Sequence, residues 1–191
     1  MSIMILALAA SGAVVSANPR ALASASELPI CGPAARLSFR DSSPVDVFTI
    51  ENITARANRD WVIAGVEIDL GPSAGRLVFD TVPGGAGQNV AQPFKARPPP
   101  GGARLADLPV VPDGAEGLAL LFSAFAPGQN FRFTIDMDDR LGGLGTRVDG
   151  PEIEGAMVTV RFADPADGRE AVLSAPFDSL SRAMPAEACL S

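Results

Sequence analysis

The acidic end of one strand-like segment is the part of this sequence best suited to chemistry. Residues 131–139 (FRFTIDMDD) alternate apolar and polar side chains and then end in three carboxylates, Asp136, Asp138 and Asp139. Aspartate is depleted in strands, and residues i and i+2 of a strand share one face with Cα atoms about 7 Å apart. The repulsion between Asp136 and Asp138 must therefore be offset, either by a hard cation such as calcium or by a neighbouring arginine.

A calcium site is the first interpretation of these acids. Calcium takes about six to eight oxygen ligands at about 2.3–2.6 Å, and the order of Asp136, Asp138 and Asp139 is not that of an EF-hand loop. The remaining ligands would have to come from other segments. Weaker candidates are Asp80, Asp149, Glu152 and Glu154. The alternative is an exposed acidic strand end that pairs with Arg132 or Arg140.

Catalysis of the common kinds finds little support. The chain has no histidine, so the usual base for a nucleophilic Ser or Cys and the commonest zinc ligand are absent. Residues 71–75 (GPSAG) match the G-x-S-x-G pattern, but they lie between two strand-like runs, where we expect a tight turn around Ser73 and no nucleophile elbow.

Paired carboxylates leave one enzymatic alternative open. A glycosidase needs two acids about 5 to 9.5 Å apart across a sugar-binding cleft. A carboxylate-dependent enzyme acting on an extracellular polymer is therefore the second candidate function. The single Trp and the lack of Tyr count against it, because sugar sites use exposed aromatic platforms.

The distribution of apolar residues predicts an all-β fold. Short runs bounded by Gly, Pro, Asn or Asp recur at the spacing of strands, and no long amphipathic helix follows the N-terminal segment. We expect an antiparallel β-sandwich of about 8–10 short strands. The predicted strands are 35–40, 45–52, 61–70, 76–80, 90–95, 117–125, 130–138, 156–162 and 170–175.

Parity along the strands predicts which side chains enter the core. In residues 61–70 the core face consists of Val62, Ala64, Val66, Ile68 and Leu70. In residues 131–138 it consists of Phe131, Phe133, Ile135 and Met137, which leaves Arg132, Thr134, Asp136 and Asp138 on the opposite face. Residues 118–125 are apolar on both faces, which suits a central strand.

The N-terminal segment predicts export. Residues 3–15 form an uncharged apolar run with the length of a signal-peptide core, shorter than the roughly 20 residues that span a bilayer, and small residues follow at Ala21, Ala23 and Ala25. We expect a secretory signal peptide at residues 1–25 and one β-sandwich domain at residues 26–191. The mature protein would be periplasmic or secreted and without a transmembrane segment.

The charge balance limits the partners. Without residues 1–25 the chain keeps 14 basic and 22 acidic residues, a net charge of −8. The basic residues are scattered and form no cluster of the kind that binds phosphates. We expect no nucleic acid partner, and a surface protein or polymer remains the expected one.

Four segments carry a family resemblance: VFTIEN at 47–52, WVIAGVEIDL at 61–70, LVFD at 77–80 and FAPGQNFRFTIDMDD at 125–139. Together they resemble small exported bacterial proteins labelled aggregation factor core proteins, a label derived from a sponge cell-adhesion protein. The resemblance covers roughly residues 45–162. It implies a β-sandwich with an adhesive or surface role and a dependence on calcium, and only Asp136, Asp138 and Asp139 match a motif that could carry such a site. From the signal, the cysteine pair, the strand pattern and the acidic strand end, we expect an exported, non-catalytic protein that binds a surface partner or polymer.

Two cysteines lie near the ends of the mature chain, at Cys31 and Cys189. An even pair in an exported protein is most simply a disulfide. A lipoprotein anchor at Cys31 is the competing interpretation, but Ile30 stands where a small residue is needed.

The disulfide can be tested by mass spectrometry of the exported protein without reducing agent, which is expected to find Cys31 joined to Cys189. Reduction is expected to lower the free energy of unfolding by up to about 5 kcal/mol, an upper figure because measured gains correlate weakly with loop length. Two free thiols after export would contradict the prediction.

Overall fold

The computed structural model describes residues 30–42, 46–55, 60–87, 90–140, 148 and 150–188. These residues form an all-β fold of two antiparallel sheets, which confirms the predicted fold class. Within these ranges no helix is long and apolar enough to cross a membrane. The predicted signal peptide at residues 1–25 lies outside the described residues.

The larger sheet has seven strands in the order β11-β1-β2-β8-β4, with β12 also beside β1 and β5 also beside β8. The smaller sheet has five strands in the order β10-β9-β3-β7-β6. The strands of the larger sheet are β1 (Ile30–Arg40), β2 (Asp46–Asn52), β4 (Val78–Asp80), β5 (Lys95–Ala96), β8 (Asn130–Asp138), β11 (Arg182–Ala183) and β12 (Ala186–Ala188). Those of the smaller sheet are β3 (Val62–Asp69), β6 (Arg104–Leu105), β7 (Gly117–Ala124), β9 (Met157–Ala163) and β10 (Glu170–Pro176). A 3₁₀ helix, η2 (Gly150–Ile153), precedes β9.

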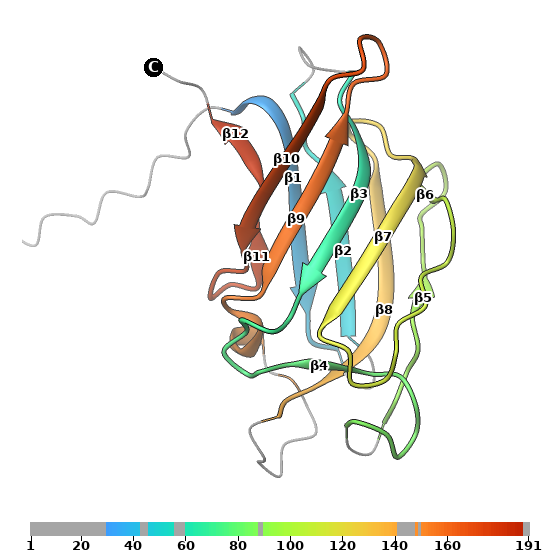
Figure 1. Ribbon diagram of the computed structural model, residues 1–191, viewed down its shortest axis with the longest axis vertical. Helices are drawn as coiled ribbons and strands as arrows, with labels where there is room; N and C mark the ends of the chain where they lie inside the picture. Colours follow the sequence, from blue (N-terminus) through green and yellow to red (C-terminus); the bar gives the residue numbers. More distant parts are fainter. Residues whose placement is uncertain are drawn as a thin grey trace, which may run out of the picture.

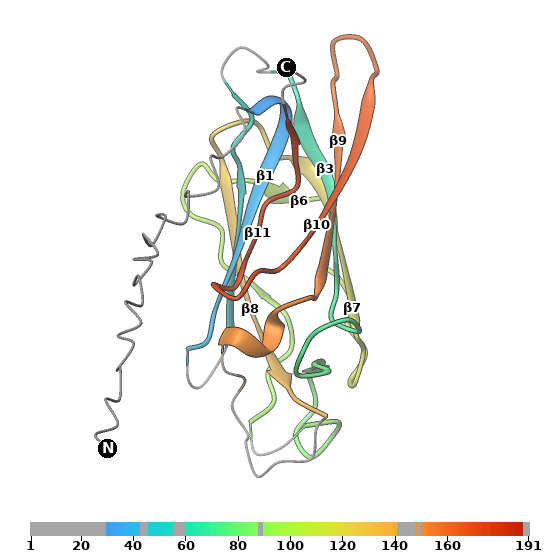
Figure 2. The ribbon, with the colours of Figure 1, turned by 90° about the vertical axis from the view of Figure 1, so that its left-hand side faces the viewer.

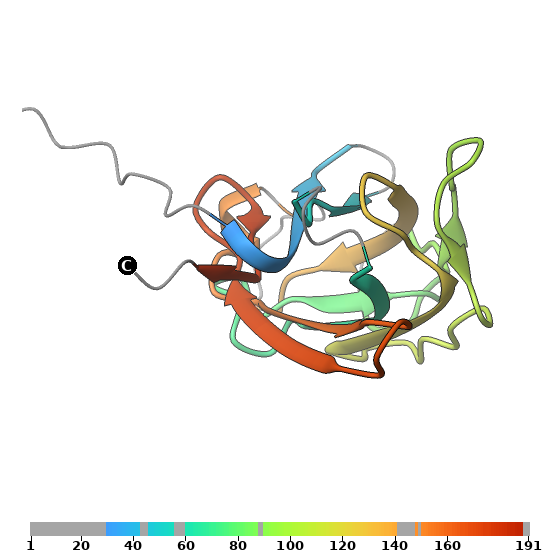
Figure 3. The same cartoon turned by 90° about the horizontal axis from the view of Figure 1, so that it is seen from above.

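The core lies between the two sheets, which form two layers when the molecule is seen from above (Figure 3). Phe48 of β2 stacks on Phe133 of β8 with ring centroids 4.9 Å apart. Phe122 of the smaller sheet meets Phe131 of β8 edge-on at 5.2 Å. The four inward side chains predicted for β8 are each at most 1% exposed, so its parity is confirmed.

The predicted parity of β3 is wrong in its first half. The register of β3 against β9 slips between Ile63 and Gly65, so the strand contains a bulge at Ala64. A bulge inserts one extra residue and reverses the alternation of faces. Val62 and Ala64 are therefore only half-buried, while Ile63 and Val66 are buried in the core.

The run at residues 118–125, which suits a central strand, forms an inner strand of the smaller sheet, β7, but it is buried on only one face. β7 does lie between β3 and β6, but β6 has only two residues. Leu118 and Leu120 point into the core, whereas Leu121 is 53% exposed on the outer face. Nothing in the described chain packs over this face of the smaller sheet strongly enough to bury Leu121.

Strand lengths explain the remaining differences from the sequence-based expectation. β8 has the predicted bounds, whereas the predicted strand 90–95 is reduced to β5 at Lys95–Ala96. β6, β11 and β12 were not predicted, and each has only two or three residues. Such short strands leave no periodic pattern to detect.

The termini of the fold lie side by side. β12 pairs with β1 so that Ile30 lies opposite Ala188, which brings together the backbone neighbours of the two cysteines. Cys189 itself lies outside the described residues. The Cys31–Cys189 disulfide therefore stays a prediction.

Candidate metal site

The acidic end of β8 lies beside β4, a short strand near the lower end of the molecule in Figure 1. In the antiparallel register Asp80 is opposite Asp136, and Val78 is opposite Asp138. Opposite residues of adjacent strands share a face, as do residues i and i+2 of one strand. Asp80, Asp136 and Asp138, here the aspartate trio, therefore gather on one face, with one carboxylate oxygen of each within 4.8 Å of the others.

This face of β8 is covered by the chain between β4 and β5, residues 81–94, here the covering segment. Residues 88–89 of it lie outside the described part. The Gln92 N–H donates to the carbonyl of Asp80 at 3.1 Å, and the Asp136 N–H donates to the carbonyl of Gln92 at 3.1 Å. The Gln92 side chain donates to Oγ1 of Thr134 at 2.9 Å. The three aspartates are consequently only 1% to 9% exposed.

Gly87 brings the backbone of the covering segment against the carboxylates. A Cβ at this position would overlap Oδ2 of Asp138 and would lie 2.6 Å from Oδ2 of Asp80. Any side chain here would force the covering segment or the carboxylates to move. The close approach therefore requires glycine at this position.

Asp113, in the loop before β7, holds the first half of the covering segment. Its Oδ1 accepts hydrogen bonds from the N–H groups of Thr81 at 2.9 Å and Val82 at 3.2 Å, and its Oδ2 accepts one from Ala86 at 2.6 Å. The Thr81 N–H, as the largest cause, lowers the pKa of Asp113. Burial, together with the hydrogen bond and charge of Asp113, raises the pKa of Asp80.

Burial and crowding make ionisation of the aspartates costly. Burial, followed by the charges of Asp138 and Asp80, raises the pKa of Asp136 to about 7. Asp46, at the start of β2, is a fourth buried acid whose Oδ2 accepts a hydrogen bond from the Met137 N–H at 3.2 Å. Burial and the charge of Asp136 nevertheless raise the pKa of Asp46 to about 8. Asp46 and Asp136 are therefore expected to keep their protons up to a pH well above the usual pKa of aspartate, unless a cation replaces these protons.

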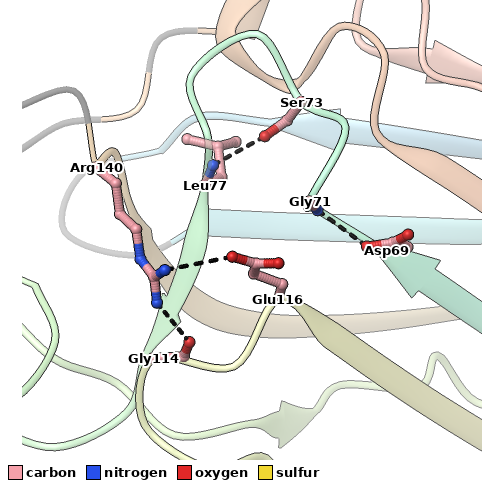
Figure 4. Close-up of polar contacts among 7 residues, drawn as sticks. All are labelled: Asp69, Gly71, Ser73, Leu77, Gly114, Glu116 and Arg140. Atoms are coloured by element: carbon pink, nitrogen blue, oxygen red, sulfur yellow. Dashed lines mark hydrogen bonds and ion pairs between the residues drawn. The ribbon is translucent and has the colours of Figure 1, made fainter.

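Within the described ranges, Arg132 and Arg140 do not pair with Asp80 or Asp136 in the way the alternative interpretation expects. In the described ranges no Lys or Arg forms an ion pair with Asp80 or Asp136. Arg140 turns toward the start of β7, where it donates to Oε1 of Glu116 at 3.3 Å and to the carbonyl of Gly114 at 3.1 Å (Figure 4). The interpretation as an exposed acidic strand end is wrong, because the two strand-end aspartates of β8 are buried.

The other predicted ligands do not join the aspartate trio. Asp139 follows the end of β8 and is half-buried, but the three-carboxylate group does not include it. Glu152 lies in η2, where its backbone carbonyl accepts a hydrogen bond from Gly75 at 2.9 Å. Glu154 is exposed beside the same turn, and Asp149 lies outside the described residues.

Sequence reasoning missed four residues that shape the site: Asp46, Gly87, Gln92 and Asp113. Asp46 comes near β8 only because β2 and β8 are neighbours in the sheet, which no local pattern reveals. Gly87 belongs to a Gly-rich stretch, residues 84–87, whose composition is typical of a loop and does not reveal what the loop contacts. A lone aspartate such as Asp113 in a Pro-rich loop carries no specific signal.

The geometry of the aspartate trio suits a hard cation. Two ligands on opposite sides of a calcium ion are separated by about twice the calcium–oxygen distance, or roughly 5 Å. Carboxylate oxygens within 4.8 Å of one another can therefore contact one ion. Oδ1 of Asp80 is buried and accepts no hydrogen bond from a described group, and such an atom is unfavourable without a partner. The trio could bind a metal ion.

Ser73 behaves as a turn residue and not as a nucleophile. It is 4% exposed, and its Oγ accepts a hydrogen bond from the Leu77 N–H at 2.8 Å. The preceding Gly71 N–H donates to Oδ1 of Asp69 at 2.9 Å (Figure 4). These contacts stabilise a compact loop, as the sequence predicts for residues 71–75.

Three grooves are lined entirely by described residues. Grooves between described residues lie at 51–54 with 126–130, on the outer face of the smaller sheet, and beside 98–104. None of these three contains a member of the aspartate trio.

The raised pKa values of Asp46 and Asp136 predict how the stability of the metal-free protein depends on pH. An acid whose pKa is higher in the folded protein stabilises the fold below its unfolded pKa near 4, and this contribution is lost as the pH rises through its folded pKa. The free energy of unfolding in chelator is therefore expected to fall as the pH rises from about 5 to about 8. Urea unfolding at several pH values in this range measures this free energy.

The interpretation of such a slope is simple because the chain has no histidine. Apart from the amino terminus, few other groups titrate between about pH 6 and 8. Asp46→Asn keeps an oxygen that can accept from the Met137 N–H, so this variant is the matched control, and its slope should be shallower. A stability that rises over this range, or a slope unchanged in the variant, would contradict the assignment.

Comparison of the chain with protein-family models, with curated proteins and with solved structures finds no match. No family is therefore assigned by similarity. The functional conclusion rests on the fold, the aspartate trio and the sequence patterns.

Proposed function

We propose that this chain is an exported, non-catalytic β-sandwich protein that binds a surface protein or polymer, and that one calcium ion held by the aspartate trio stabilises its acidic end. The observation that carries the proposal is the burial of three carboxylates within 4.8 Å of one another, with Oδ1 of Asp80 lacking a donor among the described groups. A divalent cation would supply that missing partner and offset the repulsion.

Calcium fits the available ligands better than other common metals. The trio offers only carboxylate oxygens, whereas zinc and copper favour the nitrogen and sulfur of His and Cys. Magnesium demands an octahedral site at about 2.0–2.1 Å and usually keeps several waters. Calcium accepts irregular sets of oxygen ligands, which suits three carboxylates buried beside the backbone at Gly87.

The role of the ion follows from what it would connect. Asp80 comes from β4, whereas Asp136 and Asp138 come from β8. The covering segment lies against these carboxylates at Gly87. An ion bound here would join two strands and a loop, so its role is structural.

A binding role without catalysis is supported by two features. The carboxylates are buried under the covering segment and do not line the described grooves. The predicted signal peptide and terminal disulfide suit a periplasmic or secreted protein. The resemblance to aggregation factor core proteins adds the expectation of an adhesive role, in which partners would be surface proteins or polymers.

Thermal melting with calcium and with chelator tests the cation. Ligand at 100 times its Kd stabilises a protein by about 2.7 kcal/mol, which corresponds to a rise in Tm of roughly 5–10 °C for a chain of this size. Asp138→Asn keeps the shape of the side chain but removes one charge, and it is expected to abolish most of the rise.

Asp107→Asn is the control, because Asp107 is an exposed loop residue outside the aspartate trio. This variant is expected to respond to calcium like the unmodified protein. No shift at millimolar calcium, or a shift that Asp138→Asn retains in full, would refute the proposed site.

A further inference from the structure

The edge strands of the two sheets differ in how well they are protected against pairing with another chain. An edge strand exposes unpaired N–H and C=O groups, and proteins limit the resulting association with short strands, charges, Pro or bulges. In the described fold the edges carry mostly strands of two or three residues, namely β4, β5, β6, β11 and β12. Three of these strands also carry a charged side chain that discourages pairing: Lys95 in β5, Arg104 in β6 and Arg182 in β11.

β10 is the exception among these edges. It has seven residues, and all seven pair with β9 in one uninterrupted register without a bulge. Within the described ranges β9 is its only ladder partner. Its sequence from Ala171 to Ala175 has no charge, and Pro176 stands only at its last position. Figure 2 shows β10 crossing the side of the molecule that faces the viewer.

The sequence of β10 is self-complementary in antiparallel pairing. A two-fold axis through Leu173 would place Val172 opposite Ser174 of a second copy and Ala171 opposite Ala175 of that copy. The single charge of the strand, at Glu170, would lie opposite Pro176 of the second copy. The like charges would therefore be kept at the two ends of the pairing, away from each other.

The outer face of the smaller sheet adds apolar surface to this edge. Val172 is 60% exposed and lines a shallow groove together with Leu121, which is 53% exposed. In the two-fold arrangement the two Val172 side chains, one from each copy, would be diagonal neighbours on the same face and within reach of each other. The association would bury these two side chains in addition to pairing the backbone.

We propose that the β10 edge pairs antiparallel with β10 of a second copy, around a two-fold axis at Leu173, so that the two five-stranded sheets become one continuous sheet. The second copy is the favoured occupant because this register pairs the two edges from Ala171 to Ala175 and separates their only charges. The dimer would present each binding surface twice, which multiplies weak contacts. The inference does not depend on the cation site.

A pair of charge substitutions tests both the surface and the register. Val172→Lys is expected to keep the fold, because the side chain is mostly exposed, but it would place two positive charges diagonally across the axis. Adding Ser174→Glu would set an opposite charge directly across from each introduced lysine. Sedimentation velocity of the full chain measures the association, at concentrations up to about 1 mM so that weak dimers are seen. The unmodified chain should be a dimer and Val172→Lys a monomer. The double variant should be a dimer again.

Leu108→Lys is the control, because Leu108 is 72% exposed on the loop between β6 and β7, and its dimerisation should be unchanged. Circular dichroism of each variant verifies folding. An unmodified chain that stays monomeric at every concentration would overturn the proposal. A dimer that Val172→Lys does not weaken, or a folded double variant that stays monomeric, would overturn it as well.

Discussion

Repulsion among buried carboxylates is the constraint to which the acidic end of the sandwich must conform. The pairing of β4 with β8 places Asp80, Asp136 and Asp138 on one face, and the covering segment then removes that face from water. Two charges in such an environment interact far more strongly than at the surface. A retained proton or a shared cation would relieve this repulsion, so the stability of the fold is expected to depend on pH and on metal concentration.

The surrounding residues fit this constraint. Asp113 uses three backbone N–H groups of the covering segment to hold it in place, and Gln92 connects the other half of the segment to β8. Gly87 permits the contact with the carboxylates. A segment with so little regular structure is thereby held by a few specific hydrogen bonds, and an ion beneath it would add a further connection.

The strands were predictable from the sequence to the extent that they are long and regular. Alternation along β8 predicted both its bounds and its inward face, because a period of two is a strong local signal. The bulge at Ala64 was not predictable, since an extra residue is defined by the partner strand and not by the sequence around it. The same limit applies to the site. Adjacent acids identified Asp136 and Asp138, whereas burial of their face depends on the covering segment, which has no periodic pattern.

The most direct test of a cation at the aspartate trio is calorimetric titration with calcium at about pH 6, repeated in two buffers of different ionisation enthalpy. Because burial and the charges of Asp138 and Asp80 raise the pKa of Asp136 to about 7, binding at pH 6 is expected to displace a proton. We expect one calcium ion per chain, with release of about one proton or more and loss of both signals in Asp138→Asn. Absence of binding heat, or binding that releases no proton and persists in that variant, would contradict the account.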